Sequence, residues 1–164
     1  MIKVFVSACL FGEPVRYSGT ELLFGDETLR QWLDEGRAMS FCPEVASGLT
    51  VPRPPSEIRG GSGADVLEGD ARVYNIESED LTDNFIKGAN LALKFVFSNK
   101  LGLVILKDGS PSCGSTYIYD GMFTGLHKNG MGVTAALFQK NGIPVFNQNQ
   151  VPEAAAYLEK TAYS

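Results

Sequence analysis

The segment IKVFVSA (Ile2–Ala8) opens the chain with a run of apolar residues that shows little alternation and contains no turn residue. Such a run is typical of a strand buried on both faces of a parallel sheet. The segment LGLVIL (Leu101–Leu106) has the same character, and Arg37–Cys42 and Ile143–Phe146 are predicted to be two further strands. We therefore expect an α/β fold: a single three-layer, Rossmann-like domain with a mostly parallel sheet and helices on both faces.

Helices are predicted between these strands, where apolar residues recur every three or four positions. The clearest spans about residues 82–98, and its apolar stripe is formed by Phe85, Ala89, Ala92 and Val96. The remaining helices are predicted over Asp26–Gly36, Val133–Asn141 and Pro152–Lys160.

The middle of the chain gives weaker signals. Residues 50–70 contain three closely spaced prolines and the glycine-rich Gly60–Gly63, which we expect to be a flexible loop in an irregular segment. A long loop inside a compact domain is often functional, and a solvated excursion is the alternative. Ala71–Tyr74 is predicted to be an edge strand or hairpin arm, and Tyr117–Gly121 a short strand followed by a turn.

Composition limits the class of protein. With 164 residues and 44% apolar residues, we expect a single domain over residues 1–164 and no additional C-terminal domain. The net charge of −5 argues against general nucleic-acid binding, which depends on Lys and Arg neutralising phosphates. No apolar stretch approaches the roughly 18 residues of a membrane-spanning helix. We expect a cytoplasmic protein with no membrane partner, and nothing in the composition specifies its oligomeric state.

Three cysteines each follow a predicted strand: Cys9, Cys42 and Cys113. Because parallel strands end at one edge of the sheet, where ligands of such sheets bind, we expect the thiols to converge. An odd number of cysteines excludes complete disulfide pairing, and their spacing matches neither a local zinc motif nor a ferredoxin. Apolar core filling, a three-thiolate zinc site and an iron–sulfur cluster with one open iron all remain alternatives.

The residues around these cysteines include candidate catalytic groups. Glu44 follows Pro43, whose ring restricts the backbone, and could be either a general acid or base or a solvated loop carboxylate. Ser110 and Ser112 precede Cys113. Either hydroxyl could bond a substrate or relay a proton, and ordinary turn chemistry is the alternative.

Basic residues in the predicted loops are candidates for substrate binding. A few local cations can hold an anionic or carbonyl-bearing molecule, although single cations are often solvated surface charges. Glu57 lies between two arginines and could pair with one of them. The candidate substrate-binding residues are Arg16, Tyr17, Arg53 and Lys107.

Taken together, these segments resemble the thiouracil desulfidase family, long catalogued as domain of unknown function 523. The resemblance covers roughly Ile2 to Phe146, and its Cys-Pro-Glu and Ser-Pro-Ser-Cys-Gly motifs are specific in combination. It is carried by Val6–Leu10, Val15–Tyr17, Cys42–Val45, Gly48–Leu49, Pro52–Pro55, Leu106–Lys107, Ser110–Gly114 and Ile118–Gly121.

The resemblance implies a 4Fe-4S cluster with three cysteine ligands (Cys9, Cys42 and Cys113) and one open iron that binds the sulfur of a small thiolated pyrimidine. Such a cluster is expected to be lost from an oxygen-exposed crystal. The implied reaction is a non-redox, hydrolytic desulfuration to the oxo base with release of sulfide, in which Glu44 activates water or moves protons and a nearby serine assists. The alternative is a non-catalytic cluster- or metal-binding module for sulfur sensing or delivery.

Overall fold

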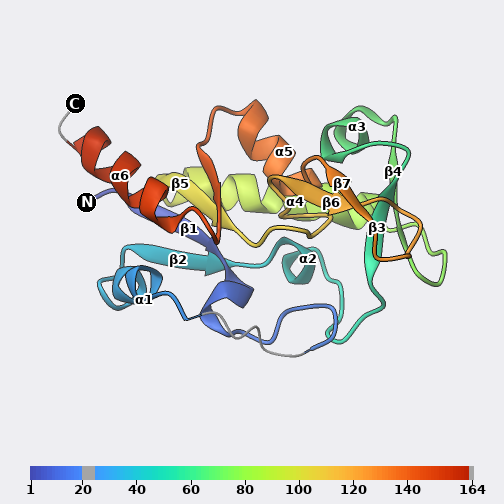
Figure 1. Ribbon diagram of the computed structural model, residues 1–164, viewed down its shortest axis with the longest axis horizontal. Helices are drawn as coiled ribbons and strands as arrows, with labels where there is room; N and C mark the ends of the chain where they lie inside the picture. Colours follow the sequence, from blue (N-terminus) through green and yellow to red (C-terminus); the bar gives the residue numbers. More distant parts are fainter. Residues whose placement is uncertain (20–24, 163–164) are drawn as a thin grey trace.

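The computed structural model describes residues 1–19 and 25–162, and its centre is a parallel sheet in the order β2-β1-β5-β8 (Figure 1). Strand β1 pairs with β2 on one side and with β5 on the other, so Val6 lies opposite both Ser40 and Ile105. The four predicted strands are confirmed, as β1 (Lys3–Ser7), β2 (Ala38–Phe41), β5 (Leu101–Leu106) and β8 (Val145–Asn147).

Helices cover both faces of this sheet, which confirms the three-layer architecture. Because side chains alternate along a strand, Val4 and Val6 of β1 pack with α1 and α6, whereas Phe5 packs with α4 and α5. Asp26 caps α1 by accepting a hydrogen bond from the backbone nitrogen of Leu29 (2.9 Å). The helices are α1 (Glu27–Asp34), α4 (Thr82–Ser98), α5 (Val133–Lys140) and α6 (Val151–Ala162).

A second group of elements extends the domain beyond the sheet. Strands β3 (Ser56–Arg59) and β4 (Arg72–Asn75) form an antiparallel pair, and β6 (Tyr117–Tyr119) and β7 (His127–Asn129) form a hairpin. Their buried side chains, among them Ile58, make a third hydrophobic cluster with residues of α4 and α5. These elements lie on the right in Figure 1.

The prediction of an irregular segment over residues 50–70 is wrong. Besides β3, the segment contains α3 (Gly63–Glu68), which begins with a capping box between Ser62 and Asp65. The glycines before it are ordered by close packing: a Cβ on Gly63 would lie 2.2 Å from the carbonyl oxygen of Gly132. Two short helices also lie where only loops were expected, η1 (Ala8–Phe11) and α2 (Pro43–Ala46).

No helix in the described part of the chain is long and apolar enough to cross a membrane.

Close contact between α4 and α2 yields a test of the packing. A Cβ on Gly88 would lie 2.4 Å from the carbonyl oxygen of Pro43, the residue at the start of α2. Helix propensity alone favours Ala over Gly by about 1 kcal/mol. We expect Gly88→Ala instead to lower the free energy of unfolding by about 1–3 kcal/mol, since the backbone must move.

Denaturant unfolding measures this change. The control is Asn90→Ala, an exposed position on the same helix, which should alter stability by no more than about 0.5 kcal/mol. A Gly88→Ala protein more stable than wild type would show that α2 and α4 are not in close contact.

Candidate functional site

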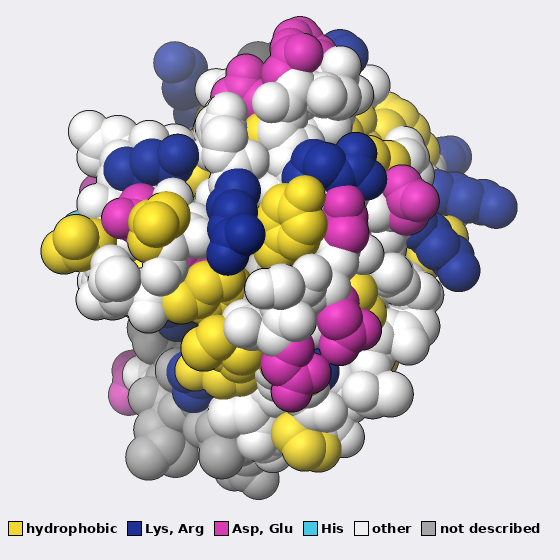
Figure 2. Space-filling view, turned by 90° about the vertical axis from the view of Figure 1, so that its right-hand side faces the viewer, with side chains coloured by type: hydrophobic (Ala, Val, Ile, Leu, Met, Phe, Trp, Pro, Cys, Tyr) yellow, Lys and Arg dark blue, Asp and Glu magenta, His cyan; other side chains and the backbone are white. Residues whose placement is uncertain are grey.

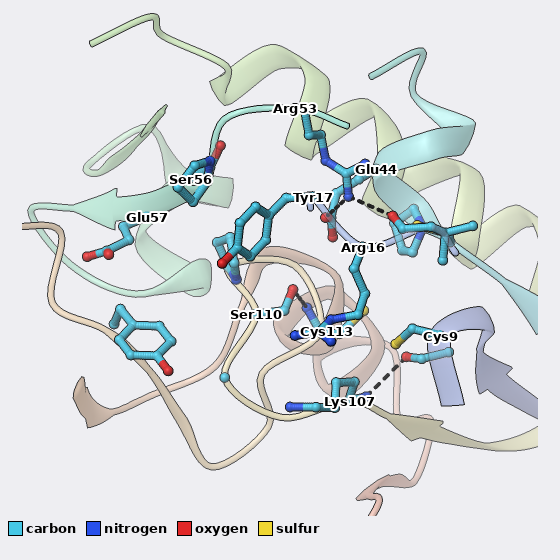
Figure 3. Close-up of a pocket in the computed structure, with 18 of the residues that line it drawn as sticks. Cys9, Arg16, Tyr17, Glu44, Arg53, Ser56, Glu57, Lys107, Ser110 and Cys113 are labelled. Carbon is cyan, nitrogen blue, oxygen red and sulfur yellow. Dashed lines mark hydrogen bonds and ion pairs between the residues drawn. The ribbon is translucent and has the colours of Figure 1, made fainter. Parts of the chain in front are cut away.

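A cavity of about 420 Å³ lies at the carboxyl ends of the central strands, where the parallel topology predicts a ligand site. Its wall includes residues that follow β1, β2 and β5 together with residues of the β3–β4 and β6–β7 pairs. Figure 3 shows several of them directed toward a common space. The predicted site residues that line it are Cys9, Arg16, Tyr17, Cys42, Glu44, Arg53, Lys107, Ser110 and Cys113.

The three cysteines converge on this cavity, as their positions after adjacent strands predict. Cys9 lies in η1 directly after β1, Cys42 is the N-cap residue of α2, and Cys113 lies in the turn after β5. All three thiols are free, with Cys113 buried and the other two partly exposed. The sheet order places β1 between β2 and β5, so neighbouring strands supply the three thiols.

The thiols also influence one another electrostatically. Burial, together with the negative charges of Cys42 and Glu44, raises the pKa of the Cys9 thiol to about 12. Burial likewise raises the pKa of Cys113 well above its usual value, and the charges of Glu44 and the other two thiols add to the effect. Three such thiols can lose their protons together only if a positive group, such as a metal centre, lies among them.

This donor set fits a cluster better than a single ion. Within residues 1–19 and 25–162, no group of three or more His, Cys, Asp or Glu side chains lies close enough together to hold one metal ion. In an iron–sulfur cluster each cysteine binds a separate iron, so the sulfur atoms stand farther apart than around one zinc ion. Three free thiols around a cavity of this size therefore suit an iron–sulfur cluster.

Glu44 is fixed by a partly buried ion pair. Arg53 Nη2 donates to Glu44 Oε2 (2.7 Å), and the two side chains are 7% and 16% exposed. Arg53 Nη2 also donates to the carbonyl oxygen of Val15 (3.0 Å), and Nη1 to that of Thr50 (3.2 Å). The guanidinium of Arg53 thus holds Glu44 and two loops in place.

Glu57 does not pair with an arginine, contrary to one of our expectations. Its Oε1 accepts hydrogen bonds from the backbone nitrogens of Gly121 (2.9 Å) and Phe123 (3.2 Å). It therefore joins β3 to the β6–β7 hairpin.

Arg16 and Lys107 place positive charge beside the cysteines. Both lower the pKa of Cys9, although burial has the larger, opposite effect. Lys107 Nζ donates to the carbonyl oxygen of Asp108 (2.9 Å), and its backbone nitrogen donates to Ser7 Oγ (3.1 Å). Figure 3 shows Arg16 and Lys107 on the same side of the cavity as Cys9.

The two candidate serines occupy different places. Ser110 lines the cavity, and its Oγ accepts hydrogen bonds from the backbone nitrogens of Ser112 (3.0 Å) and Cys113 (3.0 Å). Ser112 is 1% exposed, does not line the cavity, and shares a hydrogen bond with Thr134 Oγ1 of α5 (2.8 Å). Ser110 is therefore placed to contact a bound molecule, whereas Ser112 joins the Cys113 loop to α5.

An aromatic and aliphatic rim surrounds the outer part of the cavity, and the sequence reasoning did not identify it. Tyr117 and Tyr119 of β6, with Ile76 and Phe123, line this part. The alternation of the two tyrosines around Ile118 was the available signal, because residues two apart in a strand share a face. Figure 2 shows the molecule from the side on which these hairpins lie, with hydrophobic side chains gathered between Lys and Arg side chains.

The ion pair of Arg53 and Glu44 yields a stability test. Arg53→Ala leaves the Glu44 carboxylate partly buried without its partner. We expect the free energy of unfolding to fall by about 2–3 kcal/mol, below the range for a fully buried pair because Glu44 keeps some contact with solvent. The matched control is Arg72→Ala, which breaks a largely exposed ion pair with Asp80 and should change stability little. Equal effects of the two variants in chemical denaturation would contradict this assignment.

Comparisons with known proteins agree with this geometry. A protein of Bacillus subtilis (strain 168) named Uncharacterized protein YbbK is 41% identical over 148 residues, which span 90% of this chain and 97% of that protein. The solved structure of a protein named 4Fe-4S-dependent thiouracil desulfidase TudS is similar with a TM-score of 0.88 and 43% identity, covering 97% of this chain and 99% of TudS. The family model described as 2-thiouracil desulfurase matches residues 4–150, so the chain belongs to the 2-thiouracil desulfurase family.

Proposed function

We propose that this protein is an iron–sulfur-dependent desulfidase that converts a thiolated pyrimidine such as 2-thiouracil to the oxo base. One observation carries the proposal: three free cysteines and a carboxylate held by Arg53 line the same cavity. Family membership and the similarity to TudS support it. We further propose that residues 1–164 act as one desulfidase-like domain. A cytoplasmic location agrees with three unpaired thiols.

The proposed cofactor is a 4Fe-4S cluster held by Cys9, Cys42 and Cys113. Clusters of this kind usually have four cysteine ligands, and this chain has three cysteines in all. The iron without a cysteine ligand would supply a thiophilic Lewis acid that polarises the carbon–sulfur bond of the substrate. The positive charges of Arg16 and Lys107 would help to stabilise the thiolates of such a site.

The reaction balances without an oxidant or reductant. Water adds its oxygen to the carbon that carries sulfur, the carbon–sulfur bond breaks, and both protons of water end on the sulfide and its conjugate acid. We assign Glu44 as the general base that removes a proton from water, because Arg53 fixes its carboxylate at the cavity wall. Ser110, whose oxygen already accepts two backbone hydrogen bonds, can direct its own proton toward the substrate.

The remaining candidates would bind and orient the base. Tyr17 and the rim residues Tyr117 and Tyr119 offer flat faces for a pyrimidine ring, and base–aromatic stacking contributes about 1–3 kcal/mol. Lys107 and Arg16 are the cations available to a carbonyl oxygen or a negatively charged form of the base. Arg53 takes part indirectly, because Glu44 and two backbone carbonyls already occupy its guanidinium.

Turnover of 2-thiouracil tests the proposal. After anaerobic reconstitution with iron and sulfide, we expect the protein to convert 2-thiouracil to uracil and to release one sulfide for each uracil formed. Chromatography measures the bases and a colorimetric assay measures sulfide, with unreconstituted protein as the control. A fully loaded protein that releases no sulfide from thiolated bases would favour a non-catalytic cluster-binding module instead.

The role of Glu44 has its own test. Glu44→Gln keeps the shape of the side chain but removes the base, so we expect kcat to fall by about 100-fold or more while iron content stays at the wild-type level. Arg53→Ala breaks the same ion pair and keeps the carboxylate, so its kcat should fall less. If the two variants lose the same activity, Glu44 acts only through its ion pair and is not the base.

A further inference from the structure

Asp108 is a buried carboxylate directly after β5, at the start of the loop that carries Cys113. It is 3% exposed and accepts hydrogen bonds from both sides of that loop. The donors to Oδ1 are the backbone nitrogens of Gly109 (3.0 Å), Ser115 (2.9 Å), Thr116 (3.1 Å) and Tyr117 (3.3 Å). The donors to Oδ2 are Asn147 Nδ2 of β8 (3.2 Å) and the hydroxyl of Thr116.

These hydrogen bonds keep Asp108 ionised inside the protein. Burial alone would raise the pKa of Asp108, but the hydrogen bonds from Thr116, Ser115 and Tyr117 outweigh it and hold the pKa below its usual value. No ion pair to Asp108 is present among the described residues. The charge is therefore stabilised almost entirely by the backbone of the loop, whose two ends it holds together.

The backbone of Asp108 contributes to the same arrangement. Its nitrogen donates to Gln148 Oε1 (2.9 Å), and its carbonyl oxygen accepts from Lys107 Nζ (2.9 Å). The loop closed by its side chain also carries Ser110 and Cys113. One residue thus sets the positions of an ammonium group, a hydroxyl and a thiol that all line the cavity.

We propose that Asp108 is a positioning residue for the reaction, because its carboxylate, hydrogen-bonded by the loop and by Asn147, holds Cys113 and Lys107 in the places that the site requires. The proposal rests on the function proposed above. It assigns Asp108 no contact with substrate.

The contact with Asn147 makes this proposal testable by a reciprocal exchange. Asn147 Oδ1 accepts from the backbone nitrogen of Asn149 (2.8 Å), so the amide of Asn147 directs Nδ2 toward Asp108 and cannot turn over without losing that bond. Asp108→Asn would place two NH2 groups against each other. Adding Asn147→Asp restores a donor and an acceptor at the contact, and Asn147→Asp alone places two carboxylates there.

The experiment compares wild type, Asp108→Asn, Asn147→Asp and the double variant after anaerobic reconstitution. Iron and acid-labile sulfide per chain, the visible absorption spectrum, and kcat and KM for 2-thiouracil are measured. We expect each single variant to lose about 10-fold or more in kcat/KM and to hold less iron, as for other residues that orient metal ligands. The double variant should recover most of both losses.

Two further variants separate positioning from general stability. Asp65→Asn weakens the capping box of α3, away from the cavity, and should lower the melting temperature without changing iron content. Thr116→Val removes only the hydroxyl donor to Asp108. It should cause a smaller loss in the same direction as Asp108→Asn, and it decides the question if Asp108→Asn does not fold.

The proposal is overturned if Asp108→Asn has wild-type iron content and kcat/KM, or if the double variant is no better than Asp108→Asn. With Asp108→Asn unfolded, wild-type behaviour of Thr116→Val overturns it. Wild-type protein that takes up no cluster contradicts the proposed function itself. A loaded, active wild type with an equally active Asp108→Asn contradicts only the role of Asp108.

Discussion

The pairing of β1 with both β2 and β5 is the constraint on which the site depends. Parallel pairing in register places Ser7 opposite Phe41 and Val6 opposite Ile105, so three strands end at one edge of the sheet. A slip of one residue would turn the buried side chains of β1 to the opposite faces, so the packing of both helical layers specifies this register. Each cysteine then needs only a short connection after its strand to reach the common cavity.

Burial of the thiols brings a second constraint, which concerns charge. The thiolate form of each cysteine is unfavourable in the protein alone, and Glu44 adds further negative charge. The chain opposes this with Arg53 against Glu44 and with Arg16 and Lys107 beside Cys9. What remains uncompensated is the charge that a bound cluster would neutralise. The apo site is thus electrostatically incomplete, as expected where metal binding is coupled to proton release.

Much of the central fold could be predicted from local patterns, because each central strand is a continuous apolar run and α4 carries a regular stripe. The edge elements could not. Strand β7 reads His127–Asn129, which has no apolar alternation, and it exists because it pairs with β6. Helix α3 did leave a signal, since Ser62 and Asp65 have capping-box spacing, but the glycines before it suggested a loop.

The site was predictable to a similar depth. Convergence of the cysteines follows from strand order, whereas the contact of Arg53 with Glu44 depends on the path of the loop between them. Ser110 and Ser112 were equivalent in the sequence, and the turn before Cys113 places one at the cavity and the other against α5. The role of Asp108 was hidden because its hydrogen-bond donors are mostly backbone groups, which no side-chain pattern reveals.

The most direct test of the central claim is the iron content of the single variants Cys9→Ser, Cys42→Ser and Cys113→Ser after anaerobic reconstitution. If the three thiols hold one 4Fe-4S cluster, wild type binds about four iron and four acid-labile sulfide per chain, and each variant loses most of both. Far-UV circular dichroism checks that the variants remain folded. A folded variant that keeps the full iron and sulfide of wild type would show that its cysteine is not a ligand and would contradict the account.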